Sequence, residues 1–453
     1  MANARFRHAL LLGASYTFYA SAHPPHLALL IGVTIAAYFG ALSLGGRHKT
    51  LRILIVVTII LLPLVVFKYG SFSINLLNQA TGNSYNFFEL VLPIGISFYV
   101  FQAISYVVDV SRGEIEPRKN FCDVALYLSF FPQVLAGPIE RPKDLIPQLA
   151  KLPKPTASSC YIGLKIIVWG IFCKVVVADN IALIVDTLLN DPTQQSGLSL
   201  ALGLTLFSFQ IYFDFLGYTT IAIGAAKIFG VDLSRNFNCP YLARSIRDFW
   251  RRWHITLSTW FRDYVYVPLG GKNTLYPRRV FLIFAVFGLS GLWHGATLAF
   301  IAWGLYHGIV YLVEDLLRNK LSPQRQIIQQ FHRIILPIQI VGTFLIITIG
   351  WSLFRIQDPS NLTTTLTHIF VPGSHSNYFE LNEIFNSAHT KVALLILCIS
   401  LMFDAKQIVI CTANIIPKTK SQIAKEIALA NYLLILIFLL GGHSARDFIY
   451  YRF

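Results

Sequence analysis

The sequence predicts an all-α polytopic membrane protein, and three observations lead to this fold class. Of the 453 residues, 55% are hydrophobic and 13% are charged, and the mean hydropathy is +0.58. Soluble domains carry about 25% charged residues. Several apolar runs follow one another, each of about 20 residues, the length that an α-helix needs to span a bilayer core. Because these runs are continuous, they do not have the short alternating pattern of a β-barrel.

Nine apolar runs are counted as membrane spans, of which the first is short, and none of them has the pattern of a cleaved signal peptide. Loops 47–52, 112–120 and 417–425 are basic, which indicates the cytoplasmic side, whereas 71–86 and the later loops have few basic residues. We therefore expect a cytoplasmic N-terminus and an outward C-terminus. The expected spans are 8–22, 26–45, 51–68, 88–109, 159–189, 198–229, 334–354, 391–410 and 427–442, and the other outward loops are 190–197 and 358–390.

The net charge of +15 follows the positive-inside pattern, because the basic residues lie in short loops. They are expected to contact membrane lipids, and some are available for an anionic cytoplasmic substrate; nucleic acid is not an expected partner. The six cysteines are scattered, with no C-x-x-C and no histidine–cysteine cluster of zinc spacing. The sequence therefore predicts no metal site.

Three segments do not fit simple crossings, because basic loops flank each of them on both sides. They are 121–142, 247–271 and 280–318. Each is expected to begin and end in the cytoplasm as a re-entrant or interfacial segment. Irregular backbone at membrane depth is tolerated only inside protein or beside a water-filled cavity, so a cavity open to the cytoplasm is expected. The internal repeat typical of transporters is not seen.

The segment 247–271 reads RDFWRRWHITLSTWFRDYVYVPLGG and is predicted to be an amphipathic interfacial helix. Ser245 with Asp248 makes a helix start signal, and Arg252 lies one turn beyond Asp248, so the two can pair. His254 falls on the aromatic face. It is either a packed core histidine or a functional one, and the arginines contact either lipid headgroups or a ligand. The apolar face is expected to hold Ile246, Trp250, Trp253, Leu257, Phe261 and Tyr264.

A second histidine, His294, lies deep in the apolar segment GLSGLWHGA. Ionisable residues at such depth are costly and usually functional, and a neutral imidazole suits a general base. His307 follows in WGLYHG, and Asp109 and Asp214 read as carboxylates that bond neighbouring helices. No G-x-S-x-G elbow indicates a serine nucleophile. These residues indicate buried histidines beside a basic aromatic rim, and do not by themselves define a reaction.

Taken together, these motifs resemble the membrane-bound O-acyltransferase (MBOAT) family, in its bacterial alginate O-acetyltransferase-like branch. The resemblance covers nearly the whole chain, so a single MBOAT domain over 1–453 is expected, with a core motif region of about 92–356. It rests on the nearly continuous match of 210–271, and on LPIGISFYVFQAISYVVDV, FFPQVLAGPIERP, GLWHGA, WGLYHG, WSLFR and the tail DFIYYRF.

The resemblance implies a ring of tilted helices around a central catalytic channel, in a multi-pass protein of the bacterial inner membrane. The family moves an acyl group from a cytoplasmic thioester to an acceptor hydroxyl. Its two signature histidines match His254 and His294, the second being the expected catalytic base. The donor expected for this branch is acetyl-CoA. The expected acceptor is an extracytoplasmic glycan, or a periplasmic SGNH-type acetyltransferase partner that modifies it.

On this basis, the basic aromatic block is expected to bind the donor. Arginines favour phosphate through charge-assisted hydrogen bonds, and tryptophans can anchor the segment or contact the pantetheine arm. The expected donor-binding residues are Trp250, Arg251, Arg252, Trp253 and Arg262. Contact with lipid headgroups remains an alternative for the arginines. Alternatives for the whole protein are D-alanyl transfer to teichoic acid, acylation of a lipid or protein, and a non-enzymatic transporter.

Overall fold

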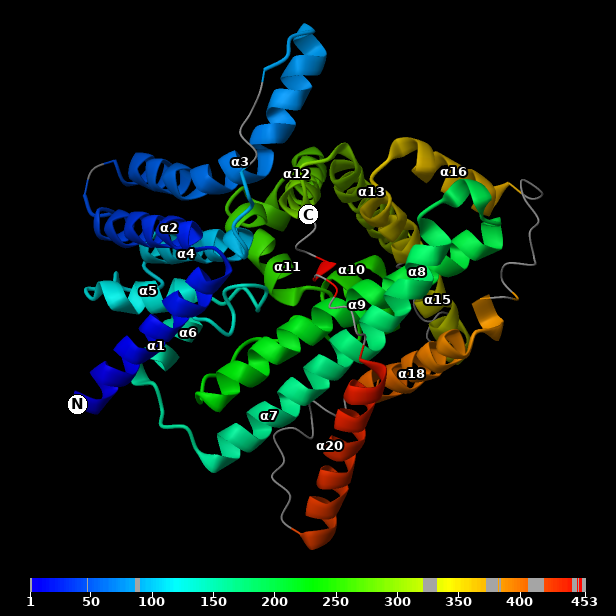
Figure 1. The fold of residues 1–453 in the computed structure, drawn as a ribbon. Helices are drawn as coiled ribbons and strands as arrows, with labels where there is room; N and C mark the ends of the chain where they lie inside the picture. The colour runs from blue at the N-terminus through cyan, green and yellow to red at the C-terminus, as the bar shows by residue number, and fades with distance from the viewer. Residues whose placement is uncertain are drawn as a thin grey trace. The chain divides into compact units, whose positions relative to one another are not determined.

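The computed structural model describes residues 2–46, 48–85, 90–320, 332–371, 382, 384–405, 419–441, 446, 448 and 449. All regular secondary structure in these residues is helical (Figure 1). The chain divides into two compact units, Met1–Ile167 with Ile221–Arg235, and Val168–Thr220 with Asn236–Phe453. The boundaries between the units lie within α7 (Ala157–Ile171), within α9 (Gly197–Ile228) and in the loop that follows α9.

The expected membrane character is confirmed, because within the described residues six helices are long and apolar enough to cross a bilayer. Five coincide with expected spans, and the sixth lies in the segment 280–318 that was expected to be re-entrant. The six are Pro24–Leu42, Lys49–Thr81, Ala157–Leu189, Gly197–Ile228, Leu298–Arg318 and Ile335–Arg355. The other four expected spans hold helices outside this set, namely α1 (Ala2–Ala22), α4 (Ile96–Arg112), α18 (Ala388–Ala405) and α20 (Lys420–Leu440).

In the first unit, α2 (Pro24–Leu42), α3 (Lys49–Thr81) and α4 pack against one another, and α1 packs on α5 (Phe121–Ser129). The stretch 71–81 was expected to belong to a loop, and this was wrong, whereas its outward placement stays a prediction. Instead α3 continues through it to a left-handed cap at Gly82. The helix contains Pro63 and bends along its length (Figure 1).

The segment 121–142 is not a simple crossing, as expected. After α5 the backbone is irregular and largely buried until α6 (Pro142–Lys151) begins. Glu140 lies in this stretch, 3% exposed, and its carboxylate accepts hydrogen bonds from the backbone N (2.5 Å) and Oγ (3.0 Å) of Ser234. The Tyr127 hydroxyl donates to the Glu140 carbonyl at 2.8 Å. The irregular chain is thus bonded within protein.

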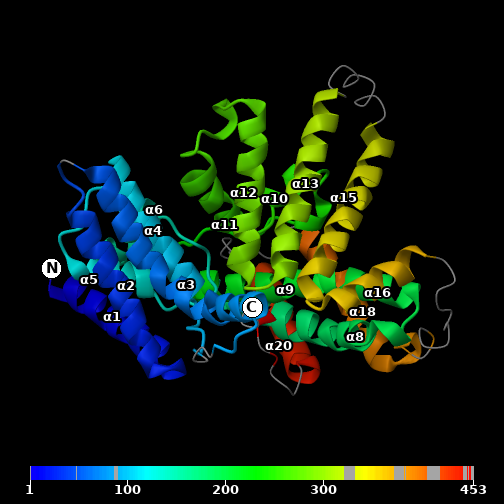
Figure 2. The same cartoon turned by 90° about the horizontal axis from the view of Figure 1, so that it is seen from above.

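In the second unit, segment 280–318 forms a helical hairpin of α12 (Tyr276–His294) and α13 (Leu298–Lys320). Gly291 faces the backbone of Phe300, and Gly304 faces that of Phe287, so glycines let the two helices approach closely. The hairpin brings the two ends of the segment to the same end of the helix pair, and the placement of both ends in the cytoplasm stays a prediction. The helix α13 also packs on α15 (His332–Arg355), and the three stand side by side (Figure 2).

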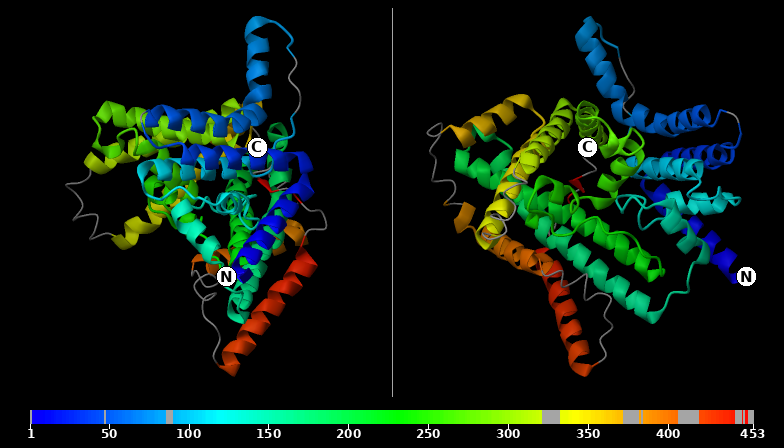
Figure 3. Two further views of the ribbon diagram at one scale, coloured as in Figure 1. Left: turned by 90° about the vertical axis from the view of Figure 1, so that its left-hand side faces the viewer. Right: turned by 180° about the vertical axis from the view of Figure 1, so that it is seen from behind.

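A π-helical stretch, Phe172–Ala178, interrupts the long helix that continues as α8 (Asp179–Leu189). Both α18 and α20 pack on this stretch, and the two helices converge in the rear view (Figure 3). The unit also contains α16 (Pro359–Phe370). Arg47 and Lys418, which lie in loops expected to be cytoplasmic, and Asn377, which lies in a loop expected to face outward, are outside the described residues. Most of the tail motif 447–453 is also outside them.

Candidate active site

The block 247–271 was predicted to be one amphipathic helix, and this was wrong. It forms α10 (Ile246–Trp250), a turn, α11 (Ile255–Phe261) and a short π-helical segment, Arg262–Tyr266. The helix breaks at His254, whose φ of 41° is left-handed and interrupts helical hydrogen bonding. The start signal is confirmed, because the Ser245 side chain accepts from Asp248 N. The pair of Arg252 and Asp248 is also confirmed, with Nε and Oδ1 2.9 Å apart.

Hydrogen bonds to the segment 236–238 hold the chain on both sides of His254. On one side, Asn238 N donates to the Arg252 carbonyl at 3.0 Å. On the other, Ile255 N donates to the Asn236 carbonyl at 2.9 Å. His254 therefore lies in a braced turn rather than along a helix.

The His254 side chain is 1% exposed and lies among aromatic rings. Its ring packs edge-on against Phe215 with centroids 4.6 Å apart, and against Trp293 at 5.9 Å. Burial lowers the pKa of His254 to about 3, because the apolar surroundings disfavour the charged imidazolium. The side chain is therefore neutral near pH 7.

His294 ends α12 at the tip of the hairpin and is 5% exposed. Its ring centroid lies 4.9 Å from those of Trp293 and Trp303, and 5.2 Å from that of Phe354. His294 is the chain neighbour of Trp293, against which His254 also packs. The fold thus brings the two histidines singled out in the sequence to one indole ring.

The two predicted donor-binding tryptophans lie in the aromatic core of this unit. Trp253 is 2% exposed and packs against Trp351 at 4.9 Å. Trp250 packs against Trp303 at 5.9 Å and against the fully buried His307 at 5.1 Å. Both tryptophans therefore pack against rings of the aromatic cluster that also surrounds His294.

The three predicted donor-binding arginines lie away from this core, nearer the surface. Arg251 is exposed, Arg252 pairs with Asp248, and Arg262 pairs with Asp263 at 2.7 Å. Arg251 and Arg262 are both exposed, whereas Arg252 is half-buried.

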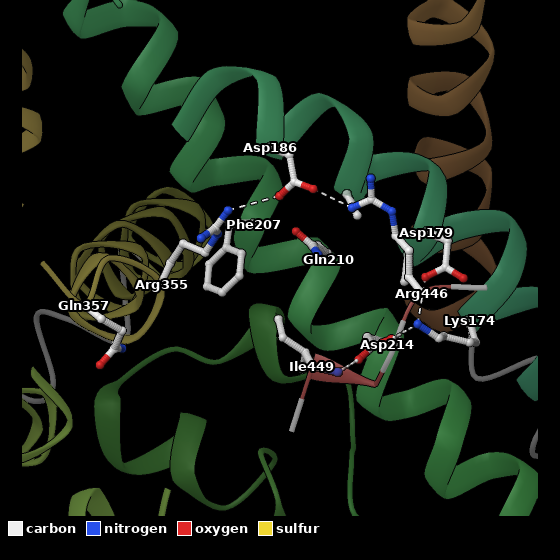
Figure 4. A pocket seen from close by; sticks show the side chains of 12 residues that line it. Lys174, Asp179, Asp186, Phe207, Gln210, Asp214, Arg355, Gln357, Arg446 and Ile449 are labelled. Carbon is white, nitrogen blue, oxygen red and sulfur yellow. Dashed lines mark hydrogen bonds and ion pairs between the residues drawn. The ribbon is translucent and has the colours of Figure 1, made fainter. Parts of the chain in front are cut away.

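The same unit contains a cavity of about 180 Å³ lined by charged side chains (Figure 4). Lys174 Nζ lies 2.7 Å from Asp179 Oδ1 and 2.6 Å from Asp214 Oδ1. Asp186 is held from two sides, by Arg355 at 3.0 Å and by Arg446 at 2.5 Å. The expected helix–helix bonding of Asp214 is confirmed by its pair with Lys174. Gln210 and Gln357 add amide groups to the lining.

Two residues that line this cavity are chain neighbours of rings in the aromatic cluster around the histidines. Asp214 precedes Phe215, which packs on His254, and Arg355 follows Phe354, which packs on His294. The hydroxyl of Thr297, just beyond His294, donates to Gln357 Oε1 at 2.5 Å. The polar cavity and the histidine cluster are therefore connected through residues that are adjacent along the chain.

Sequence reasoning missed most of this charged lining. Lys174 carried a signal, because it is a charge inside an apolar run, where charges are usually paired and functional. Its position opposite Asp179 reflects the π-helical stretch, whose hydrogen bonds join residues five apart. Arg355 and Arg446 lay at or beyond the ends of spans and could not be connected to Asp186 from the sequence.

Comparison with known proteins agrees with this architecture. Residues 114–355 match the membrane-bound O-acyltransferase family. A probable alginate O-acetylase of Pseudomonas putida is 38% identical, over 78% of this chain and 73% of the relative. The peptidoglycan O-acetyltransferase of Helicobacter pylori is 35% identical over 67% and 63%, and the teichoic acid D-alanyltransferase of Bacillus subtilis is 30% identical over 49% and 58%. The chain belongs to the membrane-bound O-acyltransferase family and is a multi-pass membrane acyltransferase.

Proposed function

We propose that this enzyme transfers an acetyl group from cytoplasmic acetyl-CoA to an acceptor hydroxyl, for O-acetylation of an extracytoplasmic polysaccharide at a bacterial inner membrane. The acetyl group is favoured because the relatives named for O-acetylation are more similar, over more of the chain, than the named D-alanyltransferase. A periplasmic SGNH-type protein is the proposed partner that carries the acetyl group onward to the glycan.

The observation that carries the proposal is the meeting of His254 and His294 at Trp293 inside an apolar cluster. His294 takes the proton of the acceptor hydroxyl, and the oxygen attacks the thioester carbonyl. The new C–O bond forms as the C–S bond breaks, and coenzyme A leaves as the thiol after receiving the proton. His254 is neutral, so its N–H can orient the donor or stabilise the developing oxyanion without adding a buried charge.

The polar and charged groups around the histidines suit the two substrates. The exposed Arg251 and the neighbouring Arg252 bind the phosphates of the donor, with Arg262 at the edge of the same block. The ion-lined cavity next to the cluster offers hydrogen-bonding groups to a hydroxyl-bearing acceptor. The aromatic rings exclude water, which would otherwise hydrolyse the thioester.

Acetyl-CoA turnover by the purified protein tests the proposal. We expect His294→Ala to remain folded and to lose at least about 100-fold in transfer, because general acid–base catalysis contributes about 10²–10⁴. His389→Ala is the matched control, since His389 lies on α18 and bonds Asn180, outside the aromatic cluster. Near-normal transfer by folded His294→Ala would remove His294 from the mechanism. Turnover of a D-alanyl thioester in place of acetyl-CoA would instead assign the enzyme to the D-alanyl branch.

A further inference from the structure

The backbone at His254 is held in a conformation that it does not adopt readily. Its φ of 41° and ψ of 55° are left-handed, a region in which residues with a Cβ atom are strained. Such a conformation persists only where surrounding bonds fix it. The conformation matters for the site, because His254 is the residue at which α11 starts after the turn that follows α10, and its backbone sets the direction of the imidazole.

Asn236 supplies most of the bonds that fix this turn. Its carbonyl accepts from Ile255 N at 2.9 Å, and its side-chain Oδ1 accepts from Thr256 N at 3.3 Å and from Thr256 Oγ1 at 2.6 Å. All three bonds go to the two residues that directly follow His254. Asn236 is 1% exposed and Thr256 is 6% exposed, so water does not compete for these bonds.

Phe237, the residue that follows Asn236, packs against the aromatic cluster around His254 and so fixes the segment that carries Asn236. Phe237 packs edge-on against Phe215 at 5.2 Å and against Trp253 at 5.1 Å. Phe215 is also the ring that packs on His254. The segment that contains Asn236 and the imidazole of His254 therefore pack against the same aromatic ring, Phe215.

We propose that Asn236 is a positioning residue of the acyl transfer: its amide oxygen, through Thr256, holds His254 in the left-handed turn that directs the imidazole to Trp293 and His294. This inference rests on the role proposed above for His254. Asn236 itself contacts neither substrate, and acts on the rate by fixing the direction of a group that does.

The Thr256 hydroxyl allows a test that does not remove the buried Asn236. Thr256→Val keeps the shape of the side chain and loses the donor to Oδ1, whereas Thr256→Ser keeps the donor. Thr259→Val is the control on the same helix, because the Thr259 hydroxyl bonds only within α11. The measurement is kcat and the KM for acetyl-CoA, per folded molecule of purified full-length protein.

We expect Thr256→Val to lower kcat about 10- to 100-fold, the cost of a misplaced catalytic group, with little change in KM. Thr256→Ser should keep most of the wild-type kcat, and Thr259→Val should match the wild type. Asn236→Ala should behave like Thr256→Val. Equal kcat values for Thr256→Val and Thr259→Val would overturn the inference, as would a loss confined to the amount of folded protein.

The inference and the proposed function fail in different ways. Full activity of folded His254→Ala would remove His254 from the reaction, and with it any positioning by Asn236. If His254→Ala is impaired while Thr256→Val retains its kcat, the proposed function stands and the role of Asn236 is rejected.

Discussion

The imidazole of His254 packs edge-on against the indole of Trp293, with ring centroids 5.9 Å apart and ring planes at 69°. Trp293 is also the chain neighbour of His294, whose ring lies 4.9 Å from the same indole. We predict that the indole, which both imidazoles contact, acts as a spacer between the two histidines. Because interiors are close-packed, its volume determines how far apart they are held.

Changing Trp293 should alter the rate through this spacing. Trp293→Phe keeps an aromatic ring between the histidines, and we expect it to retain more transfer activity than Trp293→Ala. The alanine variant leaves a cavity into which both imidazoles can shift, so a fall in kcat of about 10²-fold is expected. Acetyl-CoA turnover by the two folded variants measures this. Equal activities would show that the indole is not needed as a spacer.

Arg251→Gln should weaken donor binding more than it slows the chemistry. An exposed guanidinium that contacts phosphate acts equally in the ground state and the transition state, so KM for acetyl-CoA rises while kcat changes little. A charge-assisted hydrogen bond contributes about 1.5–3 kcal/mol, which corresponds to roughly 10- to 100-fold in KM. A short acyl thioester without phosphates should show no change. If the variant impairs both donors equally, the phosphate contact lies elsewhere.

Arg252→Gln provides the contrast within the same block, because Arg252 already pairs with Asp248 and donates to the Asn238 carbonyl. We expect it to lower the thermal unfolding temperature of the protein as well as to raise KM. Unchanged unfolding would indicate that its ion pair contributes little to the turn before His254, as is usual for partly exposed pairs.

Loss of Lys174 should destabilise the fold more than loss of Asp214. Lys174→Met leaves two buried carboxylates without their shared cation, and breaking a buried pair costs about 3–5 kcal/mol. Asp214→Asn leaves Lys174 paired with Asp179, so its effect should be smaller. Thermal unfolding in detergent micelles compares the two variants. Equal unfolding temperatures would contradict the central place assigned to Lys174.

The stability of the first unit should fall as the pH rises towards 7. Burial raises the pKa of Glu140 to about 7, from an ordinary value of about 4.5, so the folded state holds more protons than the unfolded state between these values. The stabilisation from this group is complete below pH about 4.5 and is lost as the pH rises through about 7. Glu140→Gln should flatten this dependence in thermal unfolding measured from pH 5 to 8. An unchanged slope would assign it to other groups.

Orientation in the membrane gives a further prediction. Arg278 is expected to face the cytoplasm and Gln194 the outside, and both positions are exposed. In a background without the exposed Cys122 and Cys398, a cysteine at 194 should react with an impermeant thiol reagent on intact cells, and one at 278 should not. Labelling at 278 from outside would reverse the side from which the donor is proposed to enter. Arg118 and Asn78 provide a second cytoplasmic and outward pair.

The sequence by itself determined the helical membrane class, the family and the two histidines. These depend on features that are local along the chain, namely apolar runs, short motifs and polar residues at depth. It also predicted the pairs of Ser245 with Asp248 and of Arg252 with Asp248, because both partners lie within one helical turn. The helical periodicity predicted one continuous helix through Arg251 and His254, and this was wrong. Hydrogen bonds with the segment 236–238 outweigh helical propensity there.

Only the tertiary structure decided what surrounds the histidines. Asn236 braces the turn at His254, and Arg355 and Arg446 meet at Asp186, through contacts between residues far apart in the chain. No local pattern encodes such contacts, because which helix faces which depends on packing the whole set of helices at once. The glycines of the hairpin show the same limit, because only the fold selects Phe300 and Phe287 as the residues that Gly291 and Gly304 face.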